Sequence, residues 1–211
     1  MRIAVIGHGN VGKAIGLKWA ARGHQVTFGA RDPAKADVQD LGRSHPRVDV
    51  GTVGEAVAGA GVVCLATPYA AALEFGGVAG DLGGKIVVDC TNPIGPGLQL
   101  TVGHHTSGAE ELARALPGAR VVKAFNTTGW ENMADSAYLG YGKARPVMPV
   151  CGDDAEARHV VCGLAQDLGF ESWDWGPLAG ARYLEPLAML WIVPARAGGA
   201  GPDFALALLR R

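Results

Sequence analysis

An apolar run followed by a glycine-rich turn at the start of the sequence restricts the fold more than any other feature. Arg2–Ile6 is predicted as a strand, and Gly7 to Gly12 reads G-H-G-N-V-G, which matches the pattern G-x-G-x-x-G. Asn10–Arg22 has a helical pattern and ends at Gly23. A strand that leads through such a turn into a helix is the phosphate-binding unit of dinucleotide-binding folds. The residues predicted to hold the pyrophosphate are Gly7, His8, Gly9, Asn10, Val11 and Gly12.

The rest of the chain alternates between strand-like and helix-like hydrophobic patterns. Strands are predicted at Gln25–Phe28, Val48–Val50, Val62–Ala66, Lys85–Asp89, Arg120–Ala124, Val147–Cys151 and Phe170–Asp174. Helices are predicted from Asp32-Pro33 with Asp32 as N-cap, at Thr52–Ala58, after Pro68, from Ser107 to Leu116, and at Asp153–Leu168 and Ala179–Leu190. Strands that alternate with helices form a parallel sheet. We therefore predict an α/β fold: a Rossmann-type, doubly wound, mainly parallel sheet with a short helical C-terminal extension.

The domain organisation follows from the lack of any linker, repeat or low-complexity tract. A single NAD(P)-binding Rossmann domain is predicted over residues 1–211, with a dinucleotide-binding core at 1–124. Residues 125–211 would form the second-substrate pocket and dimer contacts. Thr91–Thr106 is predicted as a loop without regular structure, and its unusual length indicates a function. The apolar segments Leu184–Val193 and Phe204–Leu209 favour a homodimer.

Composition argues against several classes of partner. The 19 Lys and Arg residues nearly balance the 20 Asp and Glu residues, so nothing favours nucleic acid. No apolar run approaches the roughly 20 residues needed to span a membrane. The run before Gly7 is too short for a signal peptide, so a cytoplasmic location is expected.

The four cysteines form no C-x-x-C pair and are expected to be reduced, buried thiols.

The end of the second strand predicts which dinucleotide is bound. NAD sites usually place an acidic residue there, whereas this chain has Gly29 and Ala30 followed by Arg31. Lys35 lies four residues further on. Two cations in place of a carboxylate favour the 2′-phosphate of NADP. The alternative is that Arg31 and Lys35 are ordinary surface charges, with Asp32 near enough to neutralise one of them.

No acid–base group stands out in the sequence. A carbonyl reductase needs a proton donor, and the candidates are Tyr69, His104, His105 and Lys123. None belongs to a Tyr-x-x-x-Lys or His–carboxylate arrangement, and the two histidines have no third ligand spaced to bind a metal. We therefore assign no catalytic residue and no metal. Hydride transfer between a nicotinamide and a flavin-like ring needs chiefly placement, because the cofactors carry the chemistry.

Several short motifs together resemble one family. The residues that carry the resemblance are Gly9–Gly12, Gly23-His24, Gly29–Arg31 with Lys35-Ala36, Ala66–Tyr69, Asp89–Pro93, Lys123–Thr127, Val150–Asp154 and Gly176–Leu178. Over essentially the whole chain they are similar to the NADPH-dependent deazaflavin reductases, the coenzyme F420-dependent NADP oxidoreductases. The family often has Ser where this chain has Ala30, and this chain is bulkier between Asn126 and Trp130.

The resemblance implies roles for residues that the pattern alone does not assign. It implies a dimeric Rossmann protein that moves a hydride between NADP(H) and a deazaflavin or flavin. The residues Ala66, Thr67, Pro68, Asn92, Asn126 and Thr127 would complete the cofactor site, with Thr67 and Pro68 on its adenosine and ribose side. Asn126–Trp130 would approach the nicotinamide, and Leu187–Leu190 would wall the deazaflavin pocket.

Two other functions remain open at this point. One is a small NADPH-dependent carbonyl or imine reductase, which would need Tyr69, His105 or Lys123 as its proton donor. The other is a non-catalytic NADP(H)-binding sensor or module, which would bind the cofactor without turnover.

Overall fold

The computed structural model describes residues 1–211 and is built on an eight-stranded sheet. Its strands are β1 (Arg2–Ile6), β2 (Gln25–Ala30), β3 (Val48–Thr52), β4 (Val62–Leu65), β5 (Ile86–Asp89), β8 (Arg120–Lys123), β9 (Val147–Gly152) and β10 (Glu171–Gly176). Their order is β10-β9-β8-β5-β4-β1-β2-β3, and only the β8–β9 pair is antiparallel. The chain reverses its direction across the sheet between β1 and β4, which creates a crevice at their carboxyl ends. The predicted doubly wound, mainly parallel sheet is confirmed.

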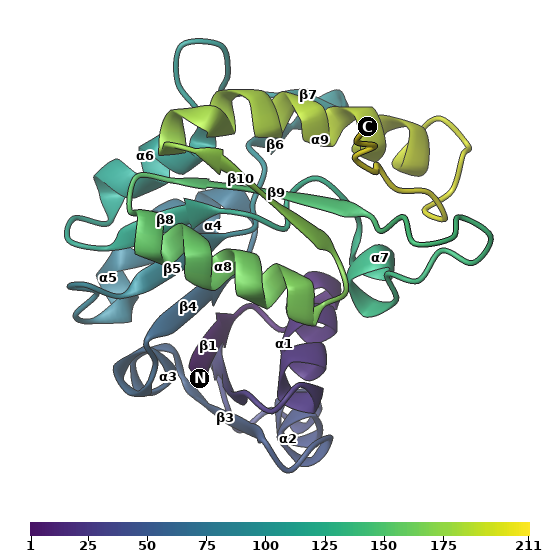
Figure 1. Cartoon of the computed structure of the whole chain (residues 1–211). Coiled ribbons are helices and arrows are strands. Elements are labelled where there is room, and N and C mark those ends of the chain that lie inside the picture. The colour runs from purple at the N-terminus through teal and green to yellow at the C-terminus, as the bar shows by residue number, and fades with distance from the viewer.

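Helices cover both faces of this sheet (Figure 1). They are α1 (Asn10–Ala21), α2 (Ala36–Arg43), α3 (Val53–Gly59), α4 (Tyr69–Leu73), α5 (Gly76–Ala79), α6 (Gly108–Ala115), α7 (Trp130–Ala134), α8 (Ala155–Asp167) and α9 (Ala181–Arg196). Buried side chains of α1, α2, α7 and α8 pack in one cluster, and those of α3 to α6 and α9 pack in the other. The sheet therefore has a core on each side.

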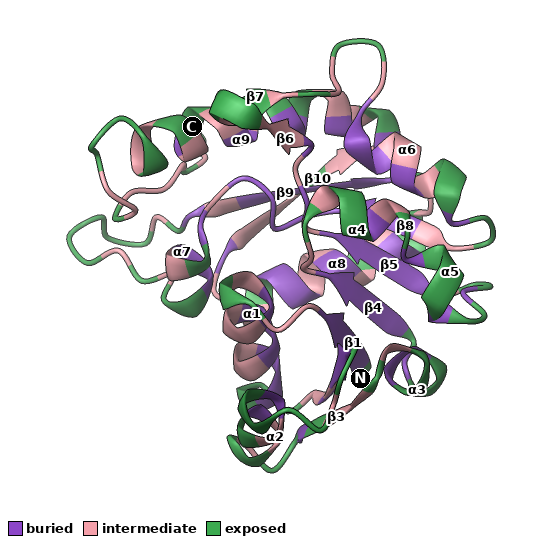
Figure 2. Ribbon diagram, turned by 180° about the vertical axis from the view of Figure 1, so that it is seen from behind, coloured by how far each residue is buried: buried purple, intermediate pink, exposed green.

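The central strands explain why the sheet forms. All residues of β4 and β5 are buried, as expected of strands covered by helices on both faces (Figure 2). Trp19 of α1 is fully buried, and its indole N–H donates to the carbonyl of Leu164 in α8 at 3.0 Å. The same ring meets Phe125 edge to face, with 5.7 Å between the ring centroids. These contacts lock α1, which begins at the glycine-rich turn, against the sheet and α8.

The prediction that Asp32 caps a helix was wrong. The Asp32 carboxylate accepts a hydrogen bond from the Ala34 N–H at 3.1 Å, which closes a tight local turn. α2 begins only at Ala36, with Lys35 at its N-cap position. Short acidic side chains often bond to the backbone two residues on, and here that turn prevents the helix from starting at Pro33.

Three other segments differ from their predicted structure. Within the predicted loop Thr91–Thr106, β6 (Ile94–Gly95) and β7 (Gln99–Leu100) form a small antiparallel hairpin around the 3₁₀ turn Pro96–Leu98. α7 was not predicted, because its five residues are too few to show a period. A second 3₁₀ turn, Leu178–Gly180, precedes α9. α9 continues past Leu190 to Arg196 and includes Pro186 and Pro194, where a proline would ordinarily end a helix.

The cysteines are all free, as expected, but only two of them are buried. Cys64 and Cys151 lie in the core, whereas Cys90 and Cys162 are partly exposed. The sulfur atoms of Cys64 and Cys90 are 3.4 Å apart. Every helix of the protein falls short of the length and apolar character that a membrane crossing requires.

Candidate functional site

Glycine is required at two positions of the turn after β1. Gly7 has a φ of +104°, and a Cβ atom there would lie 2.5 Å from the Ala66 carbonyl oxygen. A Cβ atom on Gly12 would lie 1.9 Å from the Gly7 carbonyl oxygen. The chain therefore turns sharply from β1 into α1 while it touches the segment after β4. This contact forms the floor of the crevice at the switch point.

Gly9 faces open space. Its φ of −73° suits any residue, and a Cβ atom built there meets nothing within 4 Å. Gly9 is also the N-cap of α1, where no side chain caps the helix and no acidic residue lies in the first turn. The free N–H groups and the dipole of a helix N-terminus attract anions. A phosphate in front of Gly9 would thus have free space and would face the positive end of the α1 dipole.

The end of β2 presents two cations. Arg31 and Lys35 are exposed, and neither takes part in an ion pair. Asp32 turns toward the backbone of Ala34 and does not neutralise them. On the turn itself, His8 lies 3.8 Å from the carboxylate of Asp37 in α2. Two cations without an ion-pair partner therefore lie at the rim of the crevice beside Ala30.

The segments after β5 and β8 are joined by a pair of amides. The Asn92 side chain donates to the Asn126 carbonyl at 2.8 Å, and the Asn126 side chain donates to the Asn92 side-chain oxygen at 3.1 Å. Asn126 also donates to the Leu184 carbonyl in α9 at 3.2 Å. Phe125 before it has a φ of +59°, a strained conformation for a bulky residue. Thr127 beside this pair is buried, and its hydroxyl lies 4.0 Å from the sulfur of Met148.

The buried side-chain polar atoms without a hydrogen-bond partner gather at this edge of the sheet. They are the Thr67, Thr91 and Asn126 oxygens, which follow β4, β5 and β8. Buried polar groups are nearly always paired, so three unpaired ones in adjacent turns indicate a site that a ligand or water completes. Thr67 and Asn126 were predicted site residues, and Thr91 was not. Its position within the motif Asp89–Pro93 is the signal that could have identified it.

Lys123, one of the predicted proton-donor candidates, lies in a closed ionic cluster. Its ammonium is 2.9 Å from both the Asp89 and the Glu185 carboxylates, and all three side chains are at most 1% exposed. It also donates to the Thr91 carbonyl at 2.6 Å. Burial opposes the charge, yet the two carboxylates outweigh it and raise the pKa of Lys123. Lys123 therefore keeps its proton, and all three charged side chains of the cluster are buried.

The remaining donor candidates do not converge. The Tyr69 hydroxyl donates to Glu111 at 2.5 Å, and burial together with this carboxylate raises the pKa of Tyr69. His104 and His105 are exposed on the loop after β7. No group of three His, Cys, Asp or Glu residues with the arrangement of a metal site surrounds them. Tyr69 and Lys123 lie near the same buried carboxylates but are each bound by an acidic partner, and the two histidines lie on an exposed loop.

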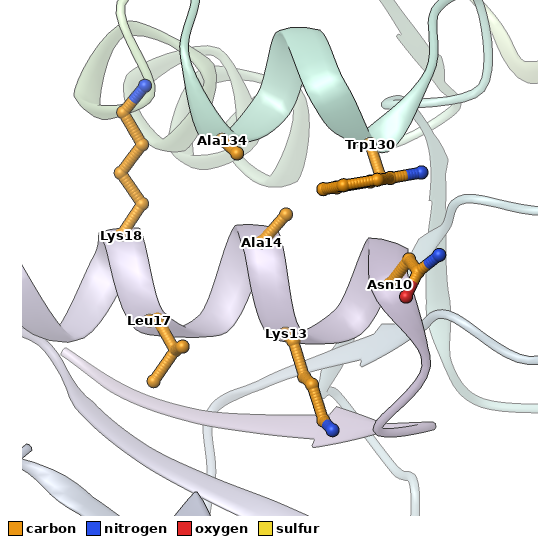
Figure 3. A pocket seen from close by; sticks show the side chains of 7 residues that line it. All are labelled: Asn10, Lys13, Ala14, Leu17, Lys18, Trp130 and Ala134. Atoms are coloured by element: carbon orange, nitrogen blue, oxygen red, sulfur yellow. The ribbon is translucent and has the colours of Figure 1, made fainter. Parts of the chain in front are cut away.

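A groove lies beside the glycine-rich turn, between α1 and α7 (Figure 3). Its volume is about 430 Å³. The residues that line it are Asn10, Lys13, Ala14, Leu17, Lys18, Trp130 and Ala134. Trp130 ends the segment Asn126–Trp130. Leu187–Leu190, the predicted wall of a deazaflavin pocket, lies on α9, where Leu187 is partly buried and Leu190 is exposed to solvent.

Sequence and structure comparisons show that the chain is similar to reductases that use NADP. Residues 2–93 match the family described as NADP oxidoreductase, coenzyme F420-dependent. The chain is 32% identical over 211 aligned residues to the F420-dependent NADP reductase of Methanothermobacter thermautotrophicus, covering 91% of this chain and 88% of that protein. It aligns over 100% of both chains, with a TM-score of 0.88 and 33% identity, to the crystal structure of a candidate F420-dependent NADP reductase from Arthrobacter sp. FB24.

A third relative is considerably longer. The chain is 31% identical over 198 residues to metalloreductase STEAP3 of Rattus norvegicus. The match covers 92% of this chain but only 38% of that protein. The similarity therefore concerns one part of the metalloreductase.

Proposed function

This chain belongs to the family of coenzyme F420-dependent NADP oxidoreductases, and from that premise we propose that it transfers a hydride between NADP(H) and the deazaflavin coenzyme F420 or a flavin. One observation supports the binding of NADP(H) more than any other. Gly9 opens onto free space at the uncapped N-terminus of α1, at the switch point of a parallel sheet. That is the place where open α/β sheets bind phosphorylated ligands.

The residues of the crevice fit a dinucleotide phosphate. The turn Gly7–Gly12 would hold the pyrophosphate through backbone N–H groups. Arg31 and Lys35, which have no carboxylate partner, would bind the 2′-phosphate next to Ala30. The segment Ala66–Pro68 would lie along the ribose, and the unpaired Thr67 hydroxyl could bond there.

The other half of the crevice would position the reacting ring. NADP(H), when bound, supplies or accepts the hydride at its nicotinamide. The buried Asn92–Asn126 pair would orient this ring, because the Asn126 side-chain oxygen is an acceptor without a partner. Neither amide can donate or remove a proton at neutral pH. The proposal thus assigns these residues to positioning and leaves the chemistry to the two cofactors.

Three further expectations are part of this proposal. Residues 1–124 would form the dinucleotide-binding core, and 125–211 the second-substrate side. The protein would be a cytoplasmic homodimer. Support for the dimer comes from α9, where Tyr183, Leu190 and Val193 are 68%, 64% and 41% exposed. Their spacing places them on one side of the helix.

The test is NADPH oxidation by the purified protein with coenzyme F420, FMN, FAD or no acceptor. We expect turnover with F420 and slower or no turnover with the flavins. NADPH binding without turnover on any acceptor would contradict hydride transfer and favour a non-catalytic NADP(H)-binding module. A titration of NADPH fluorescence, run on the same protein, separates these two outcomes.

A valine at Gly9 tests the proposed phosphate position. Gly9→Val should abolish NADPH binding and lower the unfolding temperature only modestly, because the new side chain enters space that the protein leaves open and the cost is that of a poorer N-cap residue. The control is Gly61→Val. Gly61 also has free space around its Cβ position, but it precedes β4 at the opposite edge of the sheet. Unimpaired NADPH binding by Gly9→Val would place the dinucleotide elsewhere.

A further inference from the structure

The segment Asn126–Trp130, which leads from β8 to α7, is held in place mainly by side chains. No backbone–backbone hydrogen bond joins Asn126, Thr127 or Thr128 to another part of the protein. Phe125, directly before the segment, has the strained φ of +59°. A strained backbone persists only where the surrounding structure fixes it. The position of this segment therefore depends on the side chains that pack against it.

Gly129 of this segment packs against the indole of Trp191 in α9. Its φ of −83° suits any residue, but a Cβ atom there would clash with the Trp191 ring and with the carboxylate of Glu131. Only glycine therefore lets the segment approach α9 this closely. On α9, Arg196 pairs with Glu131 at 2.8 Å, and its guanidinium lies 5.1 Å from the centroid of the Trp191 ring. Trp191 is thus a fixed support for the segment.

The C-terminal tail after α9 completes this support. The chain turns back along the helix (Figure 1), and the Phe204 ring stacks on Trp191 with 5.6 Å between the ring centroids. The Phe204 carbonyl accepts from the Trp191 indole N–H at 2.7 Å and from the Asn132 side chain of α7 at 2.8 Å. Asn132 is buried and also donates to the Thr128 hydroxyl at 2.7 Å. One carbonyl of the tail thus connects α9, α7 and the segment.

The tail is itself fixed to the sheet, two residues beyond Phe204. The Leu206 carbonyl accepts from the N–H of Val147, the first residue of β9, at 2.8 Å. Ala207 forms an antiparallel bridge with Pro146. Phe204 therefore lies between an anchor on β9 and the Trp191 ring, and the tail can hold that ring against Gly129.

We propose that Phe204 and Trp191 are positioning residues for hydride transfer: they fix Asn126–Trp130, and with it the nicotinamide ring, without contact with either substrate. This inference rests on the proposed function, which puts the nicotinamide beside Asn126. Trp191 is 1% exposed and its indole N–H is bonded within the protein, so it has no group left for a ligand. A displacement of about 1 Å between reacting groups can slow a reaction by about a hundredfold. A loosened segment should therefore affect the nicotinamide and leave the phosphate contacts of the dinucleotide unchanged.

The experiment compares Phe204→Ala with Phe204→Tyr and with the control Leu209→Ala, which shortens an 85% exposed side chain of the same tail. Each protein is titrated with NADPH and with adenosine 2′,5′-bisphosphate, which has no nicotinamide. Phe204→Ala should weaken NADPH binding by about threefold and slow single-turnover reduction of F420 by about tenfold, because the ring is less well placed. Affinity for the bisphosphate should not change. Phe204→Tyr should restore both quantities, since its ring stacks in the same way, and Leu209→Ala should match the wild type.

Trp191→Phe is the second variant, and it decides the question if Phe204→Ala does not fold. It keeps an aromatic ring but removes the N–H that holds the Phe204 carbonyl, so it should show the same selective loss. The matched control is Trp173→Phe, which replaces an indole on β10. The number of NADPH sites per chain, measured in the same titrations, corrects every rate for the folded fraction.

The outcomes separate this inference from the proposed function. If the wild type reduces F420 and the variants lose affinity for both ligands equally, or transfer hydride as fast as the wild type, the positioning role is wrong and the proposed function stands. If the wild type reduces no acceptor, the proposed reaction is wrong, and a selective loss of NADPH affinity still supports the role of Phe204 and Trp191 in placing the nicotinamide. A wild-type protein that does not bind NADPH overturns both.

Discussion

At the scale of single residues, the choice between NADP and NAD depends on two side chains. Arg31 and Lys35 stand at the end of β2, where an acidic residue would select NAD. Neither has an ion-pair partner in the protein, and the carboxylate of Asp32 is bonded to the backbone of Ala34. No carboxylate of the protein pairs with these two cations. The 2′-phosphate of NADP would supply the missing anionic partner.

We predict that Arg31→Ala raises the dissociation constant of NADPH by about tenfold, because a hydrogen bond between charged groups contributes roughly 1.5–3 kcal/mol. NADH, which has no 2′-phosphate, should bind the variant about as well as it binds the wild-type protein. The effect on NADPH should shrink as salt is added, since both groups are exposed to solvent. Fluorescence titration with each dinucleotide measures all three quantities.

Arg43→Ala is the matched control for this test. Arg43 is an exposed arginine at the other end of α2, where it pairs with Asp40 at 3.1 Å. Its loss should leave both affinities unchanged. An equal loss of NADPH and NADH binding in Arg31→Ala would mean that Arg31 acts on a part common to both dinucleotides.

The residues of the site differ in how far sequence reasoning could find them. Gly7 to Gly12 and the pair Arg31 and Lys35 lie within short segments, so the spacing alone indicates their role. The environment of Lys123 depends on Asp89 and Glu185, which come from distant parts of the chain. A lysine in an apolar strand gives no sign of such partners. For that reason only the structure shows that Lys123 is buried between two carboxylates and is not an accessible proton donor.

At the scale of elements, the ionic cluster of Lys123 ties four parts of the fold together. Lys123 ends β8, Asp89 ends β5, and Glu185 lies on α9. Glu185 also accepts from the first two N–H groups of α6, those of Gly108 and Ala109, at 2.8 and 3.0 Å. The free donors of α6 are thus capped by a residue of α9. This arrangement fixes α9 next to the Asn92–Asn126 pair.

Lys123→Met should therefore destabilise the whole domain. It leaves the carboxylates of Asp89 and Glu185 buried and without their shared cation, and breaking a buried ion pair in this way costs about 3–5 kcal/mol. Urea unfolding should show a lower midpoint with an unchanged slope. Lys143→Met removes an exposed lysine without an ion pair and should leave the midpoint nearly unchanged. A loss below about 1 kcal/mol in Lys123→Met would show that the cluster contributes little to stability.

Strands were easier to predict than helix boundaries, for a physical reason. A strand buried on both faces, such as β4 or β5, must be apolar throughout, and this is visible in the sequence. A helix end depends on local competition. Asp32 bonds to its own turn and delays α2, whereas α9 continues through Pro194 because Trp191 and Arg196 hold its last turns. Trp191 donates to the Phe204 carbonyl at 2.7 Å, and Arg196 pairs with Glu131 at 2.8 Å.

At the scale of the whole molecule, α9 leaves an apolar surface uncovered. One side of the helix is buried in the protein through Leu184, Ala188 and Trp191. The other side exposes Tyr183, Leu190 and Val193. Exposed apolar residues that share one side of a 16-residue helix are typical of a surface that contacts a partner. The sequence favoured a dimer for the same segment, but it could not show which side of the helix remains free.

We expect a charge at Leu190 to separate the proposed dimer. Tyr183, Leu190 and Val193 would pack against the same helix of a second copy, since a twofold axis brings identical surfaces together. Leu190→Glu would bury a carboxylate without a partner in that contact, so the variant should sediment as a monomer at concentrations where the wild type is a dimer. Val78→Glu is the control, because Val78 is 62% exposed but lies on α5 and should leave the dimer intact. A wild-type protein that is monomeric at micromolar concentration, or a Leu190→Glu variant that stays dimeric, would exclude α9 as the interface. NADPH affinity should be the same in both variants, because Leu190 and Val78 are both exposed and neither belongs to the proposed cofactor site.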